Sequence, residues 1–258
     1  MVFGYKSQKK SNLNEHLLPG LKTGGVFKNL KDSIYPFKYN DLNGLKDLIK
    51  RNPSIGIIKM EVIRNQIPKN NFLKNVRKLA DEKKIVLIFD ECTTGFRQSF
   101  GGIHKIYGVN PDMLMLGKAL GNGYAISAVL GKKIIMDSIK NTFISSTFWT
   151  ESLGPTAALK TLEIMKKNNT WEYITKLGKF IVSKWVVLAK KNKIKIKING
   201  IPALCSFVFL SKNHQEYKTF ITQEMLKNSF LATTTIYVSM AHNKKILRKY
   251  FNCLDKIF

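Results

Sequence analysis

The sequence is poor in acidic residues and has no isolated basic segment. It holds 17 acidic against 43 basic residues in a chain of 258, which gives a formal net charge of +26. Such a field favours anionic partners such as nucleic acid or an acidic membrane surface. The lysines are nevertheless spread along the whole chain with many Asn and Ile residues, and no RNP-like aromatic motif or zinc finger accompanies them. We therefore attribute the charge to compositional drift and expect no nucleic acid as a partner.

Cysteine, histidine and long apolar runs are also scarce. The three cysteines (Cys92, Cys205 and Cys253) are an odd number at wide spacing, which argues against a disulfide framework and fits a reducing cytoplasm. The four histidines lack ligand spacing, so we expect no metal site. No apolar run approaches the roughly 18 residues that span a bilayer, and no signal peptide is visible. We expect a cytoplasmic protein with no membrane partner.

Apolar runs alternate with amphipathic stretches between residues 54 and 130, whereas the first 50 residues look irregular. Strands are predicted at residues 55–62, 85–89, 113–116 and 125–130. A helix opened by Asn70 or Asn71 follows the first strand, and its apolar face is made of Phe72, Leu73, Val76, Leu79 and Ala80. Strands separated by helices imply right-handed crossovers, so the pattern predicts an α/β fold with a mainly parallel sheet.

Longer helices dominate the second half of the chain. Helices are predicted at residues 157–167 and 171–191, followed by strands at 194–198 and 203–210 with a turn at Asn199-Gly200 between them. A helix at 217–227, a strand at 233–238 and a helix from Asn243 complete the pattern. We therefore expect a partial large domain over residues 1–167 and a small C-terminal α+β domain over residues 168–258.

The segment with the most chemical information begins with Asp90-Glu91 at the carboxyl end of the strand at 85–89. Ligands of open α/β sheets gather beyond the carboxyl ends of the strands. Taken alone, the acidic pair is weak evidence, because it is equally suited to bind Mg²⁺ or to cap a helix.

Lys118 follows the next predicted strand and opens a glycine-rich turn, Gly121-Asn122-Gly123. We expect apolar surroundings to lower the pKa of this lysine and to favour a neutral amine nucleophile. A surface lysine in a loop is the alternative, with a high base rate in so basic a chain. The glycines favour the first interpretation, because they let the backbone approach a planar ligand closely.

Together these segments resemble the class III pyridoxal-phosphate aminotransferases. The resemblance rests on the Asp-Glu-x-x-[ST]-Gly-Phe-Arg block at 90–97, the Gly-Lys-x-[LI]-Gly-x-Gly block at 117–123 and their spacing, and it continues through residues 146–150 and the helix after Pro155. Within this class, the chain most resembles the glutamate-1-semialdehyde aminomutase-like members of surface-polysaccharide gene clusters. The resemblance implies the large-domain portion of fold type I, with a mainly parallel sheet, and a small C-terminal domain.

The resemblance also implies roles for individual residues. Lys118 would form a Schiff base with pyridoxal 5'-phosphate and move the proton at the substrate carbon. Asp90 would lie against the pyridine nitrogen and keep it protonated, so that the ring accepts electrons. Cys92 would sit on the ring where relatives hold a small apolar residue, and Thr147 would reach the cofactor phosphate of the neighbouring subunit. A homodimer is therefore expected.

The substrates implied are a small-molecule amino donor and acceptor, with a role in surface-polysaccharide or amino-sugar metabolism. Glu61 ends a strand and would orient the substrate or the ring oxygen, or serve only structure. Arg97 would hold a carboxylate, or merely pair with Glu91. Of the histidines, only His104 lies near this segment.

One departure from the family concerns the phosphate loop and the ring-stacking aromatic residue that precede this region in relatives. Thr23-Gly24-Gly25 does not follow a strand and precede a helix in the required way. We expect a fragment, either one that works with a complementary N-terminal chain or an inactive or split-gene remnant that only associates with a full-length subunit. A basic nucleic-acid-binding protein is a third, disfavoured alternative.

Overall fold

The computed structural model describes residues 2–4, 33–144, 147–148 and 150–258. The chain divides into two compact units. Unit 1 comprises Met1–Val62, Ile67–Gly95 and Gly101–Thr161, and unit 2 comprises Ile63–Gln66, Phe96–Phe100 and Leu162–Phe258. The interpretation of residues 1–167 and 168–258 as a cofactor-binding and a small domain stays a prediction. Thr23-Gly24-Gly25, Ser146 and Trp149 lie outside the described residues.

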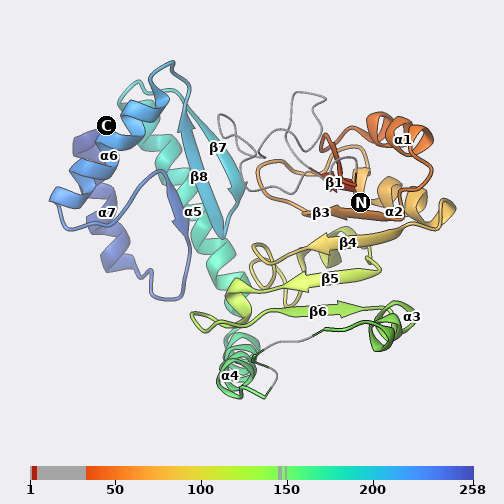
Figure 1. The fold of residues 1–258 in the computed structure, drawn as a ribbon. Helices are drawn as coiled ribbons and strands as arrows, with labels where there is room; N and C mark the ends of the chain where they lie inside the picture. Colours follow the sequence, from red (N-terminus) through yellow and green to blue (C-terminus); the bar gives the residue numbers. More distant parts are fainter. Residues whose placement is uncertain (1, 5–32, 145–146, 149) are drawn as a thin grey trace. The chain divides into compact units, whose positions relative to one another are not determined.

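Unit 1 contains a six-stranded sheet with the order β2-β1-β3-β4-β5-β6 (Figure 1). The strands are β1 (Val2–Gly4), β2 (Tyr35–Phe37), β3 (Ile57–Met60), β4 (Val86–Asp90), β5 (Met113–Leu116) and β6 (Ala128–Gly131). Every neighbouring pair from β2 to β5 is parallel, and only β6 runs antiparallel to its neighbour. The prediction of a mainly parallel sheet is confirmed.

Helices complete unit 1. They are α1 (Leu42–Arg51), α2 (Phe72–Glu82), α3 (Lys133–Met136) and the start of α4 (Leu153–Asn168), with 3-10 turns η2 (Ile103–Tyr107), η3 (Lys118–Leu120) and η4 (Asp137–Asn141). All five residues of the predicted apolar face of α2 are buried. Ile58, Leu87 and Phe89 of the central strands are 0% exposed, as expected for strands covered on both faces. The sequence pattern therefore identified the core of this unit correctly.

Two predictions for unit 1 were wrong. The first 50 residues are not irregular throughout, because α1 begins after Asp41, whose side chain accepts a hydrogen bond from the Gly44 amide, and buries Leu45 and Ile49. Its apolar residues Leu42, Leu45, Leu48 and Ile49 recur at helical spacing, so the sequence carried a signal for this helix comparable to that of α2. The strand predicted at 125–130 begins only at Ala128.

Unit 2 is an α+β unit around a three-stranded antiparallel sheet, β7-β8-β9. Its strands are β7 (Ile196–Ile201), β8 (Leu204–Phe209) and β9 (Thr235–Tyr237), and its helices are the end of α4, α5 (Thr170–Lys191), α6 (His214–Lys227) and α7 (Lys244–Ile257). Trp185 is fully buried and donates a hydrogen bond of 2.9 Å to the Tyr250 hydroxyl. Four further aromatic residues, Phe207, Phe209, Tyr250 and Phe251, pack in this core together with aliphatic side chains.

The turn predicted at Asn199-Gly200 was wrong. Both residues lie within β7, and the two-residue turn is Pro202-Ala203, between the paired residues Ile201 and Leu204. Gly200 has a φ of 83°. A side chain there would approach the Leu204 carbonyl oxygen to 2.3 Å, so the glycine serves strand packing rather than chain reversal.

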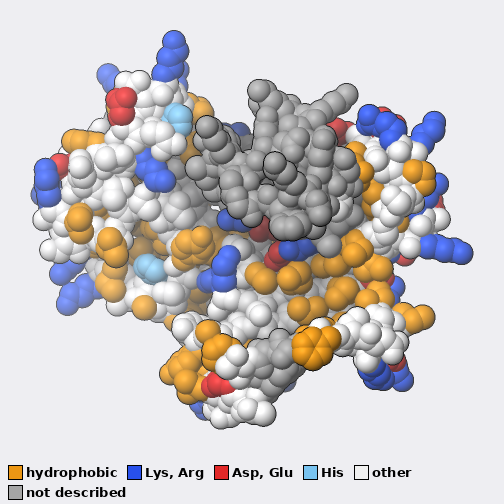
Figure 2. All heavy atoms as spheres, in the orientation of Figure 1, with side chains coloured by type: hydrophobic (Ala, Val, Ile, Leu, Met, Phe, Trp, Pro, Cys, Tyr) orange, Lys and Arg blue, Asp and Glu red, His pale blue; other side chains and the backbone are white. Residues whose placement is uncertain are grey.

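Unit 1 leaves a run of large apolar side chains exposed between residues 129 and 159. Its members are Val129, Leu130, Ile134, Ile139, Phe143, Ile144, Phe148, Leu153 and Leu159. Figure 2 shows hydrophobic side chains gathered over the β6 and α4 part of this unit. Single exposed apolar residues are normal on a surface, whereas many large ones in one part of a unit are typical of an interaction face. We call these nine residues the 129–159 apolar segment.

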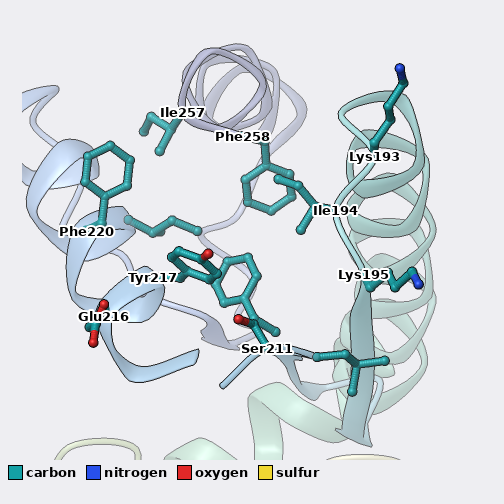
Figure 3. A pocket seen from close by; sticks show the side chains of 12 residues that line it. Lys193, Ile194, Lys195, Ser211, Glu216, Tyr217, Phe220, Ile257 and Phe258 are labelled. Carbon is teal, nitrogen blue, oxygen red and sulfur yellow. The ribbon is translucent and has the colours of Figure 1, made fainter. Parts of the chain in front are cut away.

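A cavity of about 660 Å³ lies in unit 2, between the start of β7, the end of β8 and helices α6 and α7. Its walls include the aromatic residues Phe209, Tyr217, Phe220 and Phe258 (Figure 3). Figure 3 also shows the side chains of Lys193 and Lys195 extending away from these rings. None of the sequence-predicted site residues lines this cavity.

Candidate functional site

The carboxyl ends of β3, β4 and β5 meet at one edge of the sheet in unit 1, and the predicted site residues follow these ends. Met60 is paired with Phe89, and Asp90 with Met115. Glu61 directly follows Met60 and Asp90 directly follows Phe89, whereas Gly117 and Lys118 come two and three residues after Met115. The parallel pairing brings motifs from three separate parts of the sequence to one place, as open α/β sheets do.

Asp90 is held by two partners at this edge. Its Oδ2 lies 3.0 Å from Nζ of Lys59, and its Oδ1 accepts a hydrogen bond of 3.2 Å from the Cys92 amide. Burial raises the pKa of the Asp90 carboxyl, but the Lys59 ammonium and the Cys92 amide outweigh it and hold that pKa below its ordinary value. Asp90 is consequently a carboxylate at neutral pH, as its predicted role requires.

Cys92 joins the Asp90 loop to the Lys118 loop. The backbone of Gly117 lies against it, since a side chain built at Gly117 would meet the Cys92 Sγ at 3.5 Å. Burial and the neighbouring Asp90 charge raise the pKa of the Cys92 thiol, while Lys118 and Lys59 act in the opposite direction. The residue is therefore a neutral, half-buried thiol that behaves as a small apolar group.

Lys118 projects from a strained backbone position directly after β5. Its φ of 42° is in the left-handed region, which a residue other than glycine adopts at a cost of about 1–3 kcal/mol and which is common at functional sites. Its Nζ donates a hydrogen bond of 2.6 Å to the Thr93 hydroxyl. The apolar surroundings expected for Lys118 are absent from the described structure, where the residue is exposed at the sheet edge.

The backbone of the turn after Lys118 requires glycine at two positions. A side chain at Gly121 would come within 2.2 Å of the Tyr124 carbonyl oxygen, so only glycine fits there. Gly123 has a φ of 113°. The approach of this backbone to a planar ligand stays a prediction.

Glu91 is fully buried and has a structural role beside the site. Its two carboxylate oxygens accept hydrogen bonds from the amides of Ile103 and His104 and from the Thr94 hydroxyl, and Oε1 lies 2.6 Å from Nδ1 of His104. The alternative pairing of Glu91 with Arg97 was wrong, because His104 and backbone amides occupy the carboxylate. These hydrogen bonds hold the start of η2 close to Glu91 and therefore close to Asp90.

The remaining predicted residues are placed as follows. Glu61 is half-buried and directly follows β3, and the next carbonyl, that of Val62, accepts a hydrogen bond from the Tyr39 hydroxyl. Arg97 belongs to unit 2, where burial lowers its pKa and its Nε has no hydrogen-bond partner among the described residues. Thr147 is exposed in a turn of unit 1. The structure thus brings together Asp90, Cys92 and Lys118, with Glu61 next to them by strand register.

Two residues at this edge escaped sequence reasoning. Lys59 binds Asp90, and Thr93 binds Lys118. A charged residue inside the apolar run 55–62 was a visible signal, since a lysine in a buried strand needs a partner. Thr93 carried no such signal, because its contact depends on the fold of the loop after β4.

The side chains at this edge are of the types that can bind a pyridine ring that bears an aldehyde. A primary amine on Lys118 and a carboxylate on Asp90 stand on adjacent strand ends, with a small neutral side chain, Cys92, between the two loops. Among the described residues, no group of three or more His, Cys, Asp and Glu side chains is arranged to hold a metal ion. Within the same ranges, no helix has the length and apolar character needed to cross a bilayer.

The chain is similar to known proteins of one family. The sequence model of the class-III aminotransferase family matches residues 65–248. The chain is 35% identical over 208 residues to 3-aminobutyryl-CoA aminotransferase from Cloacimonas acidaminovorans, covering 78% of this chain and 50% of that protein. It is 28% identical over 258 residues to glutamate-1-semialdehyde 2,1-aminomutase from Archaeoglobus fulgidus, covering 93% of this chain and 61% of that protein. The chain therefore spans about half to three-fifths of the length of these relatives.

Solved structures show the same fold. The FumI protein of a Sphingopyxis species, solved in its PLP internal aldimine form, superposes with a TM-score of 0.86 at 20% identity, over 99% of this chain and 63% of that one. Acetylornithine aminotransferase from Elizabethkingia anophelis superposes with a TM-score of 0.78 at 24% identity, over 88% and 62%. At these identities the likeness concerns the fold alone, and it places the chain in fold type I.

Proposed function

Because the chain belongs to the class-III aminotransferases, a family that uses pyridoxal phosphate, we propose that it is the catalytic-lysine part of an aminotransferase or aminomutase. The observation that carries the proposal is the joining of Lys118 and Asp90 at one sheet edge through Thr93, Cys92 and Gly117. Neither residue is remarkable alone. Their convergence from separate strand ends is what an enzyme of this chemistry needs.

When bound, pyridoxal phosphate supplies an aldehyde that an amine attacks and an aromatic ring that accepts electrons from the substrate carbon. Lys118 presents Nζ as that amine, and Thr93 holds it in position by the 2.6 Å hydrogen bond. Asp90 offers a negative charge to the ring nitrogen, and Cys92 provides a small apolar contact for the ring. Once released by the incoming substrate amine, Nζ of Lys118 would be free to take the proton from the substrate carbon and hold it for transfer. We assign the phosphate to Thr147 of a neighbouring subunit.

The substrates are a small-molecule amino donor and acceptor. We assign Glu61 and Arg97 to substrate binding. Glu61 lies next to Asp90 by register, and the buried Nε of Arg97 has no hydrogen-bond partner in the part of the chain that the structure describes. The similar aminomutases and 3-aminobutyryl-CoA aminotransferase support amino transfer as the reaction class. Surface-polysaccharide or amino-sugar metabolism in the cytoplasm is the setting that we propose.

The proposal predicts that pyridoxal phosphate is captured by Lys118 in preference to all other lysines. The chain is incubated with equimolar cofactor, reduced with borohydride, digested and mapped by mass spectrometry. We expect Lys118 to carry at least about ten times the label of any other lysine, because Thr93 holds its Nζ in position at the end of β5. Lys59 also lies beside Asp90, but its amine is engaged in the ion pair with that carboxylate. Even labelling of exposed lysines would contradict the proposal.

We further propose a homodimer in which the 129–159 apolar segment lies at the interface. This segment contains the exposed Phe143 and Phe148 on either side of Thr147 in the sequence, so a second copy that covers it would bring Thr147 close to the interface. Two-fold pairing is also the commonest form of oligomer.

The dimer is tested by sedimentation of the wild-type chain and two variants. Phe143 is 96% exposed, and we expect Phe143→Asp to weaken self-association by roughly 30-fold or more, since a buried aromatic anchor contributes about 2 kcal/mol or more. Ile67→Asp is the matched control, because Ile67 is an exposed apolar residue outside the segment. A monomeric wild-type chain, or equal effects of both substitutions, would refute the assignment.

The alternative is a non-catalytic chain that only associates with a complementary or full-length subunit. The same trapping and sedimentation experiments distinguish it from the catalytic proposal. The alternative predicts self-association or association with the partner but no preference for Lys118 in cofactor capture. Co-purification with a longer relative, followed by borohydride trapping in the complex, distinguishes the two.

A further inference from the structure

The contact between Lys59 and Asp90 is unexpected for a carboxylate that is to serve a ring nitrogen. Lys59 lies one residue before the end of β3, in a strand that is otherwise apolar. Its strand partner is Ile88, so its side chain and that of Asp90, two residues further along β4, lie on the same face of the sheet. The 3.0 Å contact spans neighbouring strands, and both side chains are about a quarter exposed, 23% and 25%.

The Asp90 carboxylate keeps room for a further donor. Lys59 takes Oδ2 and the Cys92 amide takes Oδ1, whereas an ionised carboxylate has about four lone-pair sites. The ion pair with Lys59 instead alters the negative charge that Asp90 presents to a ligand. The ammonium offsets much of the negative potential of Asp90 at short range, and only partial exposure to solvent weakens this effect.

We propose that Lys59 is a positioning residue for Asp90, which fixes the orientation of the carboxylate and tempers the negative charge that it presents to the ring nitrogen of the cofactor. The inference rests on the proposed function. It means that the ring nitrogen is held less strongly protonated than by an aspartate alone. The cofactor ring would therefore accept electrons from the substrate carbon less readily. The orientation of the Asp90 carboxylate would be fixed before the cofactor binds.

Stability alone is a poor explanation of the pair. Partly exposed ion pairs contribute little to folding, typically within a factor of about five in the folding equilibrium. Other titratable groups share this edge, namely Cys92 beside Asp90, Lys118 acting on Cys92, and Glu61 after β3. A structural role for Lys59 would leave their reactivity unchanged, so this reactivity is a suitable readout.

The first measurement uses the cofactor-free chain. Lys59 lowers the pKa of the Cys92 thiol, so Lys59→Met is expected to slow alkylation of Cys92 by iodoacetamide about threefold at pH 8, and Lys59→Arg to restore the rate. Alkylation of Cys253 provides an internal reference. Lys78→Met is the matched control, since it removes one positive charge from an exposed site of unit 1 with only a 3.9 Å contact to Glu82. An unchanged Cys92 rate in a folded Lys59→Met chain would overturn the proposed electrostatic role.

The second measurement uses pyridoxal phosphate labelled with ¹⁵N in the ring. We expect the nitrogen resonance of the bound cofactor to move toward the protonated position in Lys59→Met, and to stay at the wild-type position in Lys59→Arg and Lys78→Met. In an Asp90→Asn background, Lys59→Met should produce no such shift. A bound cofactor with the same resonance in wild type and Lys59→Met would overturn this inference alone. Failure of the wild-type chain to bind the cofactor even when it is combined with a complementary N-terminal chain would overturn the proposed function, and this inference with it.

Discussion

Replacing Lys118 by alanine is expected to abolish covalent capture of pyridoxal phosphate and to lower any amino transfer by at least about 10³-fold. The loss combines the missing nucleophile with the missing proton carrier, and a general acid–base group alone contributes about 10²- to 10⁴-fold. Little effect on folding is expected, because Lys118 is exposed and its backbone is already strained. An alanine at a φ of 42° is strained as well, so unfolding of the variant is measured in parallel.

Lys118→Arg separates charge from chemistry in this experiment. Arginine keeps the positive charge next to Thr93 but has no amine able to attack an aldehyde. We expect it to be as defective as alanine in borohydride trapping, whereas Lys78→Ala should trap as much cofactor as the wild type. Trapping by the Lys118→Arg chain at the wild-type level would show that another lysine is the nucleophile.

Glu91→Ala is expected to destabilise unit 1 by about 3–5 kcal/mol. The carboxylate is 0% exposed, and it accepts hydrogen bonds from two backbone amides and the Thr94 hydroxyl and contacts the His104 ring. Its removal leaves buried donors without an acceptor, which is among the most costly changes in a protein interior. The free energy of unfolding is measured by denaturant titration, monitored by Cys92 alkylation so that the signal comes from unit 1.

Glu82→Ala is the control for this prediction. Glu82 is an exposed glutamate of unit 1 at the end of α2 and makes a long ion pair of 3.9 Å with Lys78, so its loss should change stability by at most about 0.5 kcal/mol. Equal effects of the two substitutions would mean that the Glu91 network contributes nothing specific. Because Glu91 adjoins Asp90, the destabilised variant should also expose Cys92 to alkylation more readily.

Hydrophobic patterning was sufficient to predict the parallel sheet and α2. The runs around residues 57–60, 86–90 and 113–116 are apolar except for Lys59 and the terminal Asp90, and the helical face 72–80 repeats every three or four residues. These signals are local, and burial of the same residues in the structure follows from them directly. Helix α1 was missed although its apolar residues recur at helical spacing. The turn was placed at Asn199-Gly200 instead of Pro202-Ala203 because Asn-Gly is a strong turn dipeptide, which the strand pairing overrides here.

The sequence by itself determined which residue types stand at the ends of β4 and β5, because both motifs are contiguous in the chain and follow predictable strands. The tertiary structure alone decided their partners. Lys59 reaches Asp90 and Lys118 reaches Thr93 only through strand register and loop geometry, and Glu91 turned to His104 instead of Arg97 because the loop before η2 folds over it. Such contacts join residues 13 to 31 positions apart, as between Glu91 and His104 or Lys59 and Asp90, and local periodicity contains no information on pairings at that distance.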